Sequence, residues 1–174
     1  MKTDYQLLVI GAGPAGMAAA QAAARHGVEV ALLDEQSHPG GQIYRNVDSG
    51  PLAEVSMLGK DYVFGKPLVQ AFRHAGLDYH AGASVWYLDK TRQLGVLKQG
   101  ENHRLEAQKI ILATGAQERP MPIPGWQLPG VMTAGAGQIL LKSAGIVPQG
   151  RLVLAGNGPL LLLLAWQYLV QYHQ

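Results

Sequence analysis

Three glycine-containing clusters have the residue types and spacing to bind phosphate groups. The first is Gly11-Ala12-Gly13-Pro14-Ala15-Gly16, which follows an apolar run and opens an alanine-rich segment. In such a turn the first glycine makes the bend, the second lets the backbone approach a pyrophosphate, and the third allows close helix–strand packing. The start of the following helix supplies N–H groups and a partial positive charge. The pattern predicts a dinucleotide site, while a merely tight strand–helix turn is the simpler alternative.

An acidic pair follows at a spacing that suits a ribose. Asp34 ends the next apolar run, and Glu35 comes directly after it. A carboxylate in this place can accept hydrogen bonds from ribose hydroxyls and repels a 2′-phosphate. Asp34 is the first candidate for this role, and Glu35 is the alternative.

The other two clusters indicate a nucleotide site only in combination with the first. Pro39-Gly40-Gly41-Gln42 would by itself be a turn, and the strand-like run ending in Ala113-Thr114-Gly115 would by itself be structural. At these distances from the first cluster, both segments are expected to run close to the same nucleotide.

The elements needed to position these residues are readable from the apolar pattern. Tyr5–Ile10 and Val28–Leu33 read as buried strands and Pro14–His26 as the helix between them, which makes a βαβ unit of a parallel sheet. A helix over 66–75 follows an irregular stretch. Shorter β-like runs then suggest a small antiparallel meander laid against the sheet, followed by a buried strand. These runs are 77–80, 83–89, 95–98 and 103–107, and the last strand is 109–113.

The rest of the chain begins to repeat the opening pattern. A proline-rich stretch over 120–130 predicts an extended crossover or linker, and 133–144 predicts a helix. A strand at 151–154, a glycine turn and a helix from Leu160 onward would start a second unit. Leu161 stands where a third glycine belongs, so a nicotinamide nucleotide, NAD(P), is a doubtful ligand there.

Taken together, the clusters resemble the FAD-dependent pyridine nucleotide-disulfide oxidoreductase-like flavoproteins. The chain is particularly similar to the FAD-binding subunits of opine oxidases, proline and hydroxyproline dehydrogenases and hydrogen cyanide synthases. The residues that carry the resemblance are GAGPAGMAAA at 11–20, LLDEQSHPGGQIYR at 32–45, ATGAQERPMPIPGWQLPGVMTAGAGQ at 113–138 and AGNGPLLLL at 155–163. It implies a chain that is an N-terminal portion of a longer protein.

The resemblance implies an α/β fold, a doubly wound Rossmann-like FAD-binding domain with a small β-meander and the start of a second Rossmann-like unit. The FAD-binding domain would cover 1–119, a linker or crossover 120–150, and an incomplete second dinucleotide unit 151–174. The FAD-binding residues that it implies are Gly11, Gly13, Pro14, Ala15, Gly16, Asp34 or Glu35, Gly41, Gln42, Val85 through its backbone to the adenine, Ala113, Thr114 and Gly115.

The activity implied by the resemblance is that of an FAD-dependent dehydrogenase for an amino-acid-like or opine substrate, working with a second flavoprotein subunit. No residue is assigned as a catalytic acid or base. Two alternatives stay open: an NAD(P)H-dependent flavin reductase of the same fold, and a truncated remnant that binds nucleotide without catalysis.

Composition restricts the chemistry further. The chain has no cysteine, which excludes a redox-active cysteine pair, an iron–sulfur cluster and a thiolate metal site within it. The six histidines lack metal-like spacing, so no metal is expected. Net charge is +2 without a basic stripe, which argues against nucleic acid. The apolar run from Pro159 is shorter than a bilayer span requires, so we expect no membrane span. The absence of cysteine fits a reducing compartment, so we expect a cytoplasmic protein.

Overall fold

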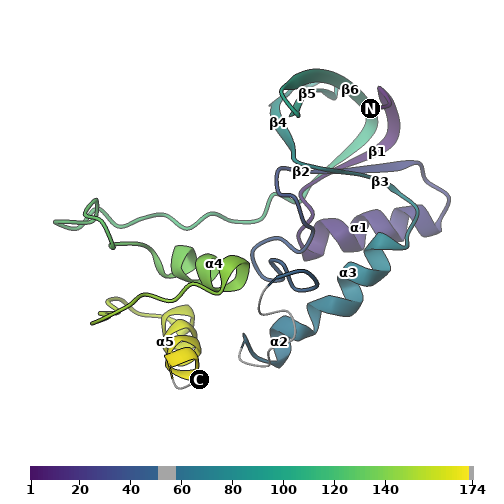
Figure 1. Cartoon of the computed structure of the whole chain (residues 1–174). Helices are drawn as coiled ribbons and strands as arrows, with labels where there is room; N and C mark the ends of the chain where they lie inside the picture. The colour runs from purple at the N-terminus through teal and green to yellow at the C-terminus, as the bar shows by residue number, and fades with distance from the viewer. Residues whose placement is uncertain (51–57, 173–174) are drawn as a thin grey trace. The chain divides into compact units, whose positions relative to one another are not determined.

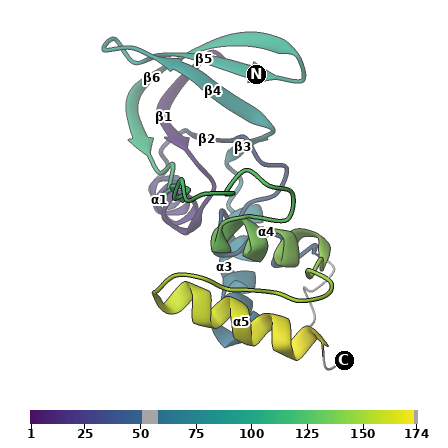
Figure 2. The same cartoon turned by 90° about the vertical axis from the view of Figure 1, so that its left-hand side faces the viewer.

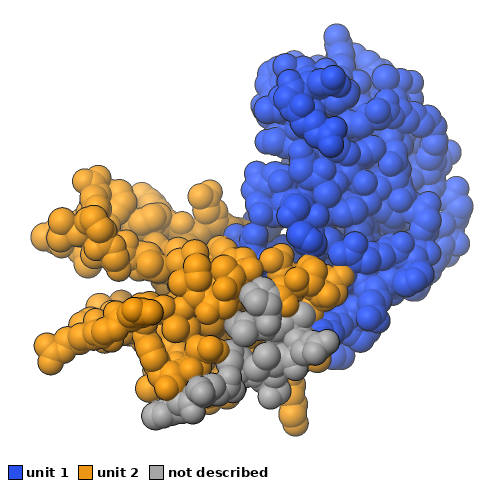
Figure 3. Space-filling model, in the orientation of Figure 1, with its two compact units in different colours: residues 1–45, 64–115 blue, residues 46–63, 116–174 orange. Residues whose placement is uncertain are grey.

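The computed structural model describes residues 1–50 and 58–172, and the chain divides into two compact units. Unit 1 comprises Met1–Arg45 and Phe64–Gly115, and unit 2 comprises Asn46–Val63 and Ala116–Gln174 (Figure 3).

Unit 1 opens with the predicted βαβ unit. Strand β1 (Asp4–Ile10) and strand β2 (Val30–Asp34) pair in parallel, and helix α1 (Pro14–Arg25) connects them. Pro14 lies in the first turn of α1, where its missing N–H costs nothing, and a run of alanines favours the helix behind it. Small residues on the buried face of α1, among them Gly16 and Ala20, let the helix lie close to the sheet.

A second crossover extends the parallel sheet. Helix α3 (Gly65–Arg73) buries Val69 and Phe72 and leads into strand β3 (Asp78–Ala81), which pairs in parallel with β2. The interpretation of 77–80 as part of the meander was therefore wrong. A strand that returns through a helix lies parallel to its predecessor, whereas a hairpin would have made it antiparallel.

The meander consists of β4 (Ala83–Leu88), β5 (Gln93–Lys98) and β6 (Glu101–Leu112), which pair with one another in antiparallel order. The two runs expected over 103–107 and 109–113 are one strand, which corrects the sequence interpretation. Its first half pairs with β5 and its second half pairs in parallel with β1. The sheet order is β3-β2-β1-β6-β5-β4 (Figure 1).

The core of unit 1 lies on both faces of its parallel strands. Helices α1 and α3 cover one face, and the meander curls over the other (Figures 1 and 2). Between the meander and the parallel strands is an apolar cluster made by Tyr5, Leu8, Ala31, Leu33, Ala83, Leu94, Val96, Leu105 and Ala107. This arrangement confirms the α/β fold class with a meander laid against the sheet.

Unit 2 is built from helices α2 (Lys60–Val63), α4 (Ala134–Ala144) and α5 (Pro159–Tyr172). The expected helix over 133–144 is confirmed, with Thr133 as its N-cap accepting from the Ala136 N–H at 3.3 Å. The Glu118 carboxylate also accepts from the Gly135 N–H at 2.8 Å, so an acidic group lies at the positive end of α4. Helices α4 and α5 lie side by side (Figure 2).

Two other expectations for unit 2 have different outcomes. The stretch 120–130 is non-helical, as its prolines require. No strand forms at 151–154, which corrects the predicted strand. A strand exists through pairing with a neighbour, and the described part of the chain holds a single sheet, to which this segment contributes nothing. Among the helices of the described residues, none has the length and apolar content that a bilayer span requires.

Candidate functional site

The carboxyl ends of β1 and β6 bring the first and third clusters together. Ile10 and Leu112 are paired residues of the two parallel strands, and the Ala113 N–H donates to the Ile10 carbonyl at 2.8 Å. The glycine turn and Ala113-Thr114 therefore leave the same edge of the sheet as neighbours.

Two glycines of the turn are required by this neighbourhood. A methyl group on Gly11 would collide with the Ala113 carbonyl and lie 3.3 Å from the Thr114 nitrogen, and Gly11 has a φ of +105°. A methyl group on Gly16 would collide with the Gly11 carbonyl oxygen and lie 3.3 Å from the Ala113 side chain. Both positions are closed to any side chain because backbone atoms, which cannot move aside, occupy the space.

The middle glycine has the opposite surroundings. Apart from its own chain neighbours, no heavy atom of the described residues lies within 4 Å of the position that a Gly13 side chain would take. Gly13 is also the N-cap residue of α1, and within the described residues no side chain caps this helix. The α1 N-terminus thus presents backbone N–H groups beside a residue without a side chain, which fits a phosphate group.

The second cluster runs over this turn. The Gly40 N–H donates to the Ala12 carbonyl at 2.8 Å. Gly41 has a φ of +61°, and a side chain on it would lie 2.8 Å from the Gly13 Cα atom. A side chain at Gly41 would therefore obstruct the approach to Gly13. Gln42, directly after it, is exposed.

The two acidic residues differ in their contacts: the Asp34 carboxylate accepts hydrogen bonds from two backbone N–H groups, whereas the Glu35 carboxylate is exposed. Asp34 accepts from the Ala12 N–H with one oxygen and from the Gln36 N–H with the other, the latter at 2.7 Å. Glu35 is exposed and accepts only from its neighbour, the Gln36 side chain, at 3.2 Å among the hydrogen bonds of the described residues.

A buried hydroxyl belongs to a tyrosine that packs against helix α3. Tyr79 of β3 places its ring edge-on against Phe72, with centroids 5.1 Å apart, and its hydroxyl has no hydrogen-bond partner among the described residues. Burial raises the pKa of Tyr79 first, and the negative charge of Asp34 raises it further. Tyr79 therefore stays protonated and keeps a hydroxyl donor available.

The remaining predicted residues are placed as follows. Thr114 and Gly115 lie beyond the end of β6, and Pro14 and Ala15 form the first turn of α1. Val85 lies in β4, an edge strand, where it pairs with Val96 and packs against the apolar cluster. An edge strand keeps one row of backbone groups unpaired. The structure brings Gly11, Gly13, Gly16, Asp34, Gly41 and Ala113 into one group, whereas the contacts of Val85 are with the apolar cluster and Val96.

The sequence did not predict two features of unit 1: a polar cluster around the buried His80, and the hydrogen bonds that Asp34 accepts from backbone N–H groups. His80 lies 3.0 Å from the Asp78 carboxylate, 3.4 Å from the Tyr5 hydroxyl and 3.3 Å from the Lys98 nitrogen. Burial, the largest cause, lowers the pKa of His80, and the Asp78 charge opposes the shift. The signal was present in the Asp78-Tyr79-His80 run, since charged groups in a strand need partners when the strand is buried.

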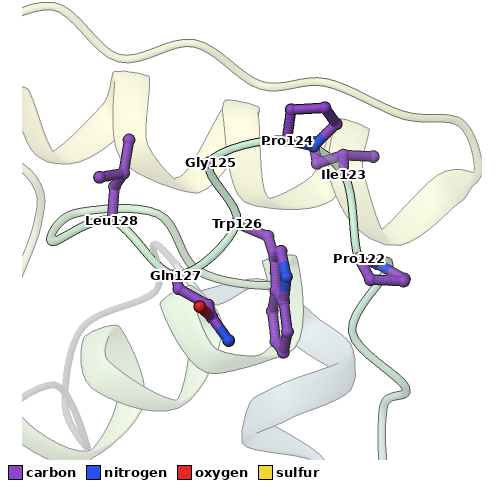
Figure 4. Close-up of a pocket in the computed structure, with 7 residues that line it drawn as sticks. All are labelled: Pro122, Ile123, Pro124, Gly125, Trp126, Gln127 and Leu128. Carbon is purple, nitrogen blue, oxygen red and sulfur yellow. The ribbon is translucent and has the colours of Figure 1, made fainter.

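Unit 2 contains a hollow formed by residues of its own. It has a volume of about 460 Å³ and is lined only by consecutive residues of the proline-rich segment, from Pro122 to Leu128 (Figure 4). Ile123, Trp126 and Leu128 are exposed there. None of its lining side chains is ionisable, so it offers no acid–base chemistry. Within the part of the chain that the structure describes, no group of three or more His, Asp or Glu side chains could hold a metal ion.

Comparison with known proteins agrees with this geometry. The family model of the pyridine nucleotide-disulphide oxidoreductases matches residues 5–168. The chain belongs to this family. It therefore shares a fold in which a glycine turn after the first strand opens a Rossmann-like unit.

Among curated proteins, the chain is similar to subunits of two kinds of enzyme, opine oxidase and hydrogen cyanide synthase. The chain is 54% identical over 171 residues to the opine oxidase A-type subunit from Agrobacterium tumefaciens (strain Ach5), covering 94% of this chain and 34% of that protein. It is 41% identical over 170 residues to the hydrogen cyanide synthase subunit HcnB of Pseudomonas aeruginosa, covering 92% of this chain and 35% of that protein. The chain thus spans about a third of the length of the curated relatives that it matches.

A solved structure supports the fold. The crystal structure of L-proline dehydrogenase from P. horikoshii matches with a TM-score of 0.65 and 21% sequence identity, covering 80% of this chain and 28% of that chain. At this identity the likeness concerns the fold alone.

Proposed function

We propose that unit 1 binds FAD and that the chain is the FAD-binding portion of an oxidoreductase of the opine oxidase type. The observation that carries the proposal is the surroundings of Gly13. Two segments distant in the sequence, at Gly40-Gly41 and at Ala113, meet at the glycine turn, and backbone atoms close two glycines of the turn. Gly13 stays accessible at the start of α1, which no side chain of the described residues caps. This is what a pyrophosphate requires.

The roles of the turn residues follow from their positions. Gly13, Pro14 and Ala15 would face the pyrophosphate, because they form the start of α1. Gly11 and Gly16 would act indirectly, by allowing the turn to fold against Ala113. Their requirement for glycine is one of packing and not of ligand contact.

The residues around the turn would hold the two ends of the cofactor. Asp34, at the end of β2, would receive the ribose hydroxyls with the lone pairs that its two N–H bonds leave free, and the exposed Glu35 is the alternative. Gly41 and Gln42 would lie toward the flavin, and Thr114 and Gly115 would close over the cofactor. Val85 would pair with the adenine through the unpaired backbone edge of β4.

Bound FAD would supply the redox chemistry by accepting two electrons from the substrate. The residues of this chain would hold and orient it. We propose an amino-acid-like or opine substrate and a second flavoprotein subunit, because two of the similar proteins are named as subunits of opine oxidase and hydrogen cyanide synthase. No side chain of the described residues is proposed as a catalytic acid or base.

The test is a visible absorption spectrum of the purified chain, followed by identification of the nucleotide released on denaturation. We expect flavin absorption and the release of FAD, either as purified or after incubation with added FAD. A protein that stays colourless and binds no added FAD by calorimetry, while its circular dichroism shows a folded sheet, would contradict the proposal. Binding of FMN with equal strength would also contradict it, since FMN lacks the adenosine half that unit 1 is proposed to hold.

A further inference from the structure

Gln36 uses all four of its polar groups in hydrogen bonds. Its backbone N–H donates to the Asp34 carboxylate at 2.7 Å, and its carbonyl accepts from the Gly82 N–H at 3.1 Å. Its side-chain oxygen accepts from Arg45 Nη1 at 2.8 Å, and its side-chain nitrogen donates to the Glu35 carboxylate at 3.2 Å. The two backbone bonds tie Gln36 to the end of β2 and to the residue between β3 and β4, so its side chain extends from a fixed backbone.

The bond between the guanidinium and the glutamine side chain closes the base of a loop, residues 37–45. At the tip of this loop, Gly40 is buried and its N–H donates to the Ala12 carbonyl at 2.8 Å. A side chain on Gly41 would lie 2.8 Å from the Gly13 Cα atom, so the tip lies against the start of α1. The 37–45 loop therefore borders the place where unit 1 is proposed to receive the pyrophosphate.

The contact at the base of the loop needs an acceptor on the Gln36 side chain. A guanidinium carries only donors, so Arg45 can bond only to an acceptor at this position. Both side chains are half-buried, and a hydrogen bond to a charged group contributes more than one between neutral groups. Gln36→Glu would keep the acceptor for Arg45 and lose the donor to Glu35, whereas Gln36→Leu would remove both.

We propose that the Gln36–Arg45 contact is a latch: it holds the tip of the 37–45 loop against the glycine turn and thereby retains the pyrophosphate of the bound nucleotide. Gln36 and Arg45 are thus positioning residues, which act through the backbone of Gly40 and Gly41. The proposal rests on the proposed function, since it assumes that the turn receives a pyrophosphate. A cofactor held in this way leaves the site only when the loop moves off the turn, so the latch controls the rate of dissociation.

The position of the loop is tested first without any ligand, by hydrogen exchange of the Gly40 amide in the full chain. Gln36→Leu should make this amide exchange about tenfold faster, the factor expected for the loss of one hydrogen bond to a charged group. Gln36→Glu should exchange like the wild type, because it keeps the acceptor for Arg45. An unchanged Gly40 amide in Gln36→Leu would overturn the proposal. Equally fast exchange in Gln36→Glu and Gln36→Leu would assign the effect to the Glu35 contact and would also overturn it.

Gln93→Leu is the matched control. The Gln93 side-chain oxygen accepts from Arg104 and its side-chain nitrogen donates to Glu106, so the same kind of contact is lost, but between β5 and β6. This variant should leave the exchange of the Gly40 amide unchanged. Faster exchange of Gly40 in Gln93→Leu would indicate a general loss of stability and contradict a specific latch.

Retention of the cofactor is measured as the dissociation rate of FAD, followed by flavin fluorescence after rapid dilution. Gln36→Leu should raise this rate about tenfold, while Gln36→Glu and Gln93→Leu should leave it at the wild-type value. Arg45→Met should match Gln36→Leu, and the double variant should be no faster than either single one, because both substitutions break the same bond. Additive effects of the two substitutions, or an unchanged rate in Gln36→Leu, would contradict the latch.

These outcomes separate the latch from the proposed function. A wild-type chain that binds no FAD refutes the proposed function, and the exchange of the Gly40 amide alone then decides whether Gln36 holds the loop. If Gln36→Leu does not fold, Arg45→Met provides the same comparison from the other side of the bond. If neither variant folds, the contact serves the fold itself and the proposal is wrong.

Discussion

The molecule contains the same short motif twice, and the two copies have different surroundings. In unit 1, Gly11-x-Gly13 follows a strand of a six-stranded sheet, and the third glycine, Gly16, is pressed against backbone. In unit 2, Gly156-x-Gly158 follows a segment that joins no sheet, and Leu161 takes the third position. Both motifs continue with proline and open a helix.

The difference shows what each glycine is for. A side chain on Gly156 would meet only the Leu161 side chain, at 3.7 Å, and one on Gly158 would meet no atom within 4 Å among the described residues. The helix in unit 2 is thus not drawn against a strand, and a leucine fits at the third position. A third glycine is required where the turn folds back so that its own backbone lies against the helix, as the Gly11 carbonyl does at Gly16.

The largest expected effect is on folding at the crowded glycine. Gly16→Ala would drive a methyl group into the Gly11 carbonyl, so we expect it to destabilise unit 1 by roughly 3 kcal/mol or more, at the upper end for single substitutions. Urea unfolding followed by circular dichroism measures this. Gly13→Ala is the control in the same turn, and equal losses of stability in the two variants would contradict the distinction between them.

The next effect is on binding at the accessible glycine. Gly13→Ala places a methyl group where, beyond the chain neighbours of Gly13, no atom of the described residues lies within 4 Å, so the fold should persist while the approach of a pyrophosphate is blocked. We expect FAD affinity to fall at least about tenfold, which corresponds to about 1.4 kcal/mol. Fluorescence or calorimetric titration with FAD gives the affinity. Unchanged FAD affinity in a folded Gly13→Ala protein would show that the nucleotide does not approach this residue.

Acidification should affect the stability of unit 1 through His80. Its pKa is lowered in the folded protein, so as pH falls through 6.5 the unfolded state takes up the proton first. Stability is therefore highest above pH 6.5, decreases as pH falls toward the folded-state value, and levels off below it. This loss should disappear in His80→Gln. Denaturant midpoints between about pH 5 and 8, a range about the ordinary histidine pKa, provide the measurement. A stability that rises on acidification would contradict the shift.

The smallest effect is expected from completing the second motif. Leu161→Gly restores the glycine spacing in the first turn of α5, at a cost of less than about 1 kcal/mol in helix stability. It should confer no affinity for NADH, because the preceding segment is not a strand of the sheet. Tryptophan fluorescence quenching by NADH checks this, with the wild type as control. NADH binding gained by Leu161→Gly would show that spacing alone makes the site.

Several elements of both units could be predicted from the local pattern. The strand–turn–helix–strand start, the helix before β3 and the helix α4 are confirmed within a few residues, because apolar periodicity and glycine or proline positions determine such elements locally. The prediction failed where pairing decides. Residues 103–112 belong to one strand because its halves have different partners, β3 joins the parallel sheet, and 151–154 has no partner.

The candidate site shows the same division. The sequence by itself determined the type and order of the three clusters, since turns need glycine and helix starts accept proline. It did not distinguish glycines closed by backbone from the one left accessible, nor the engaged Asp34 from the exposed Glu35. Only the tertiary structure decided these, because they depend on atoms about 100 residues away, just beyond β6, and on hydrogen bonds between loops that no local pattern encodes.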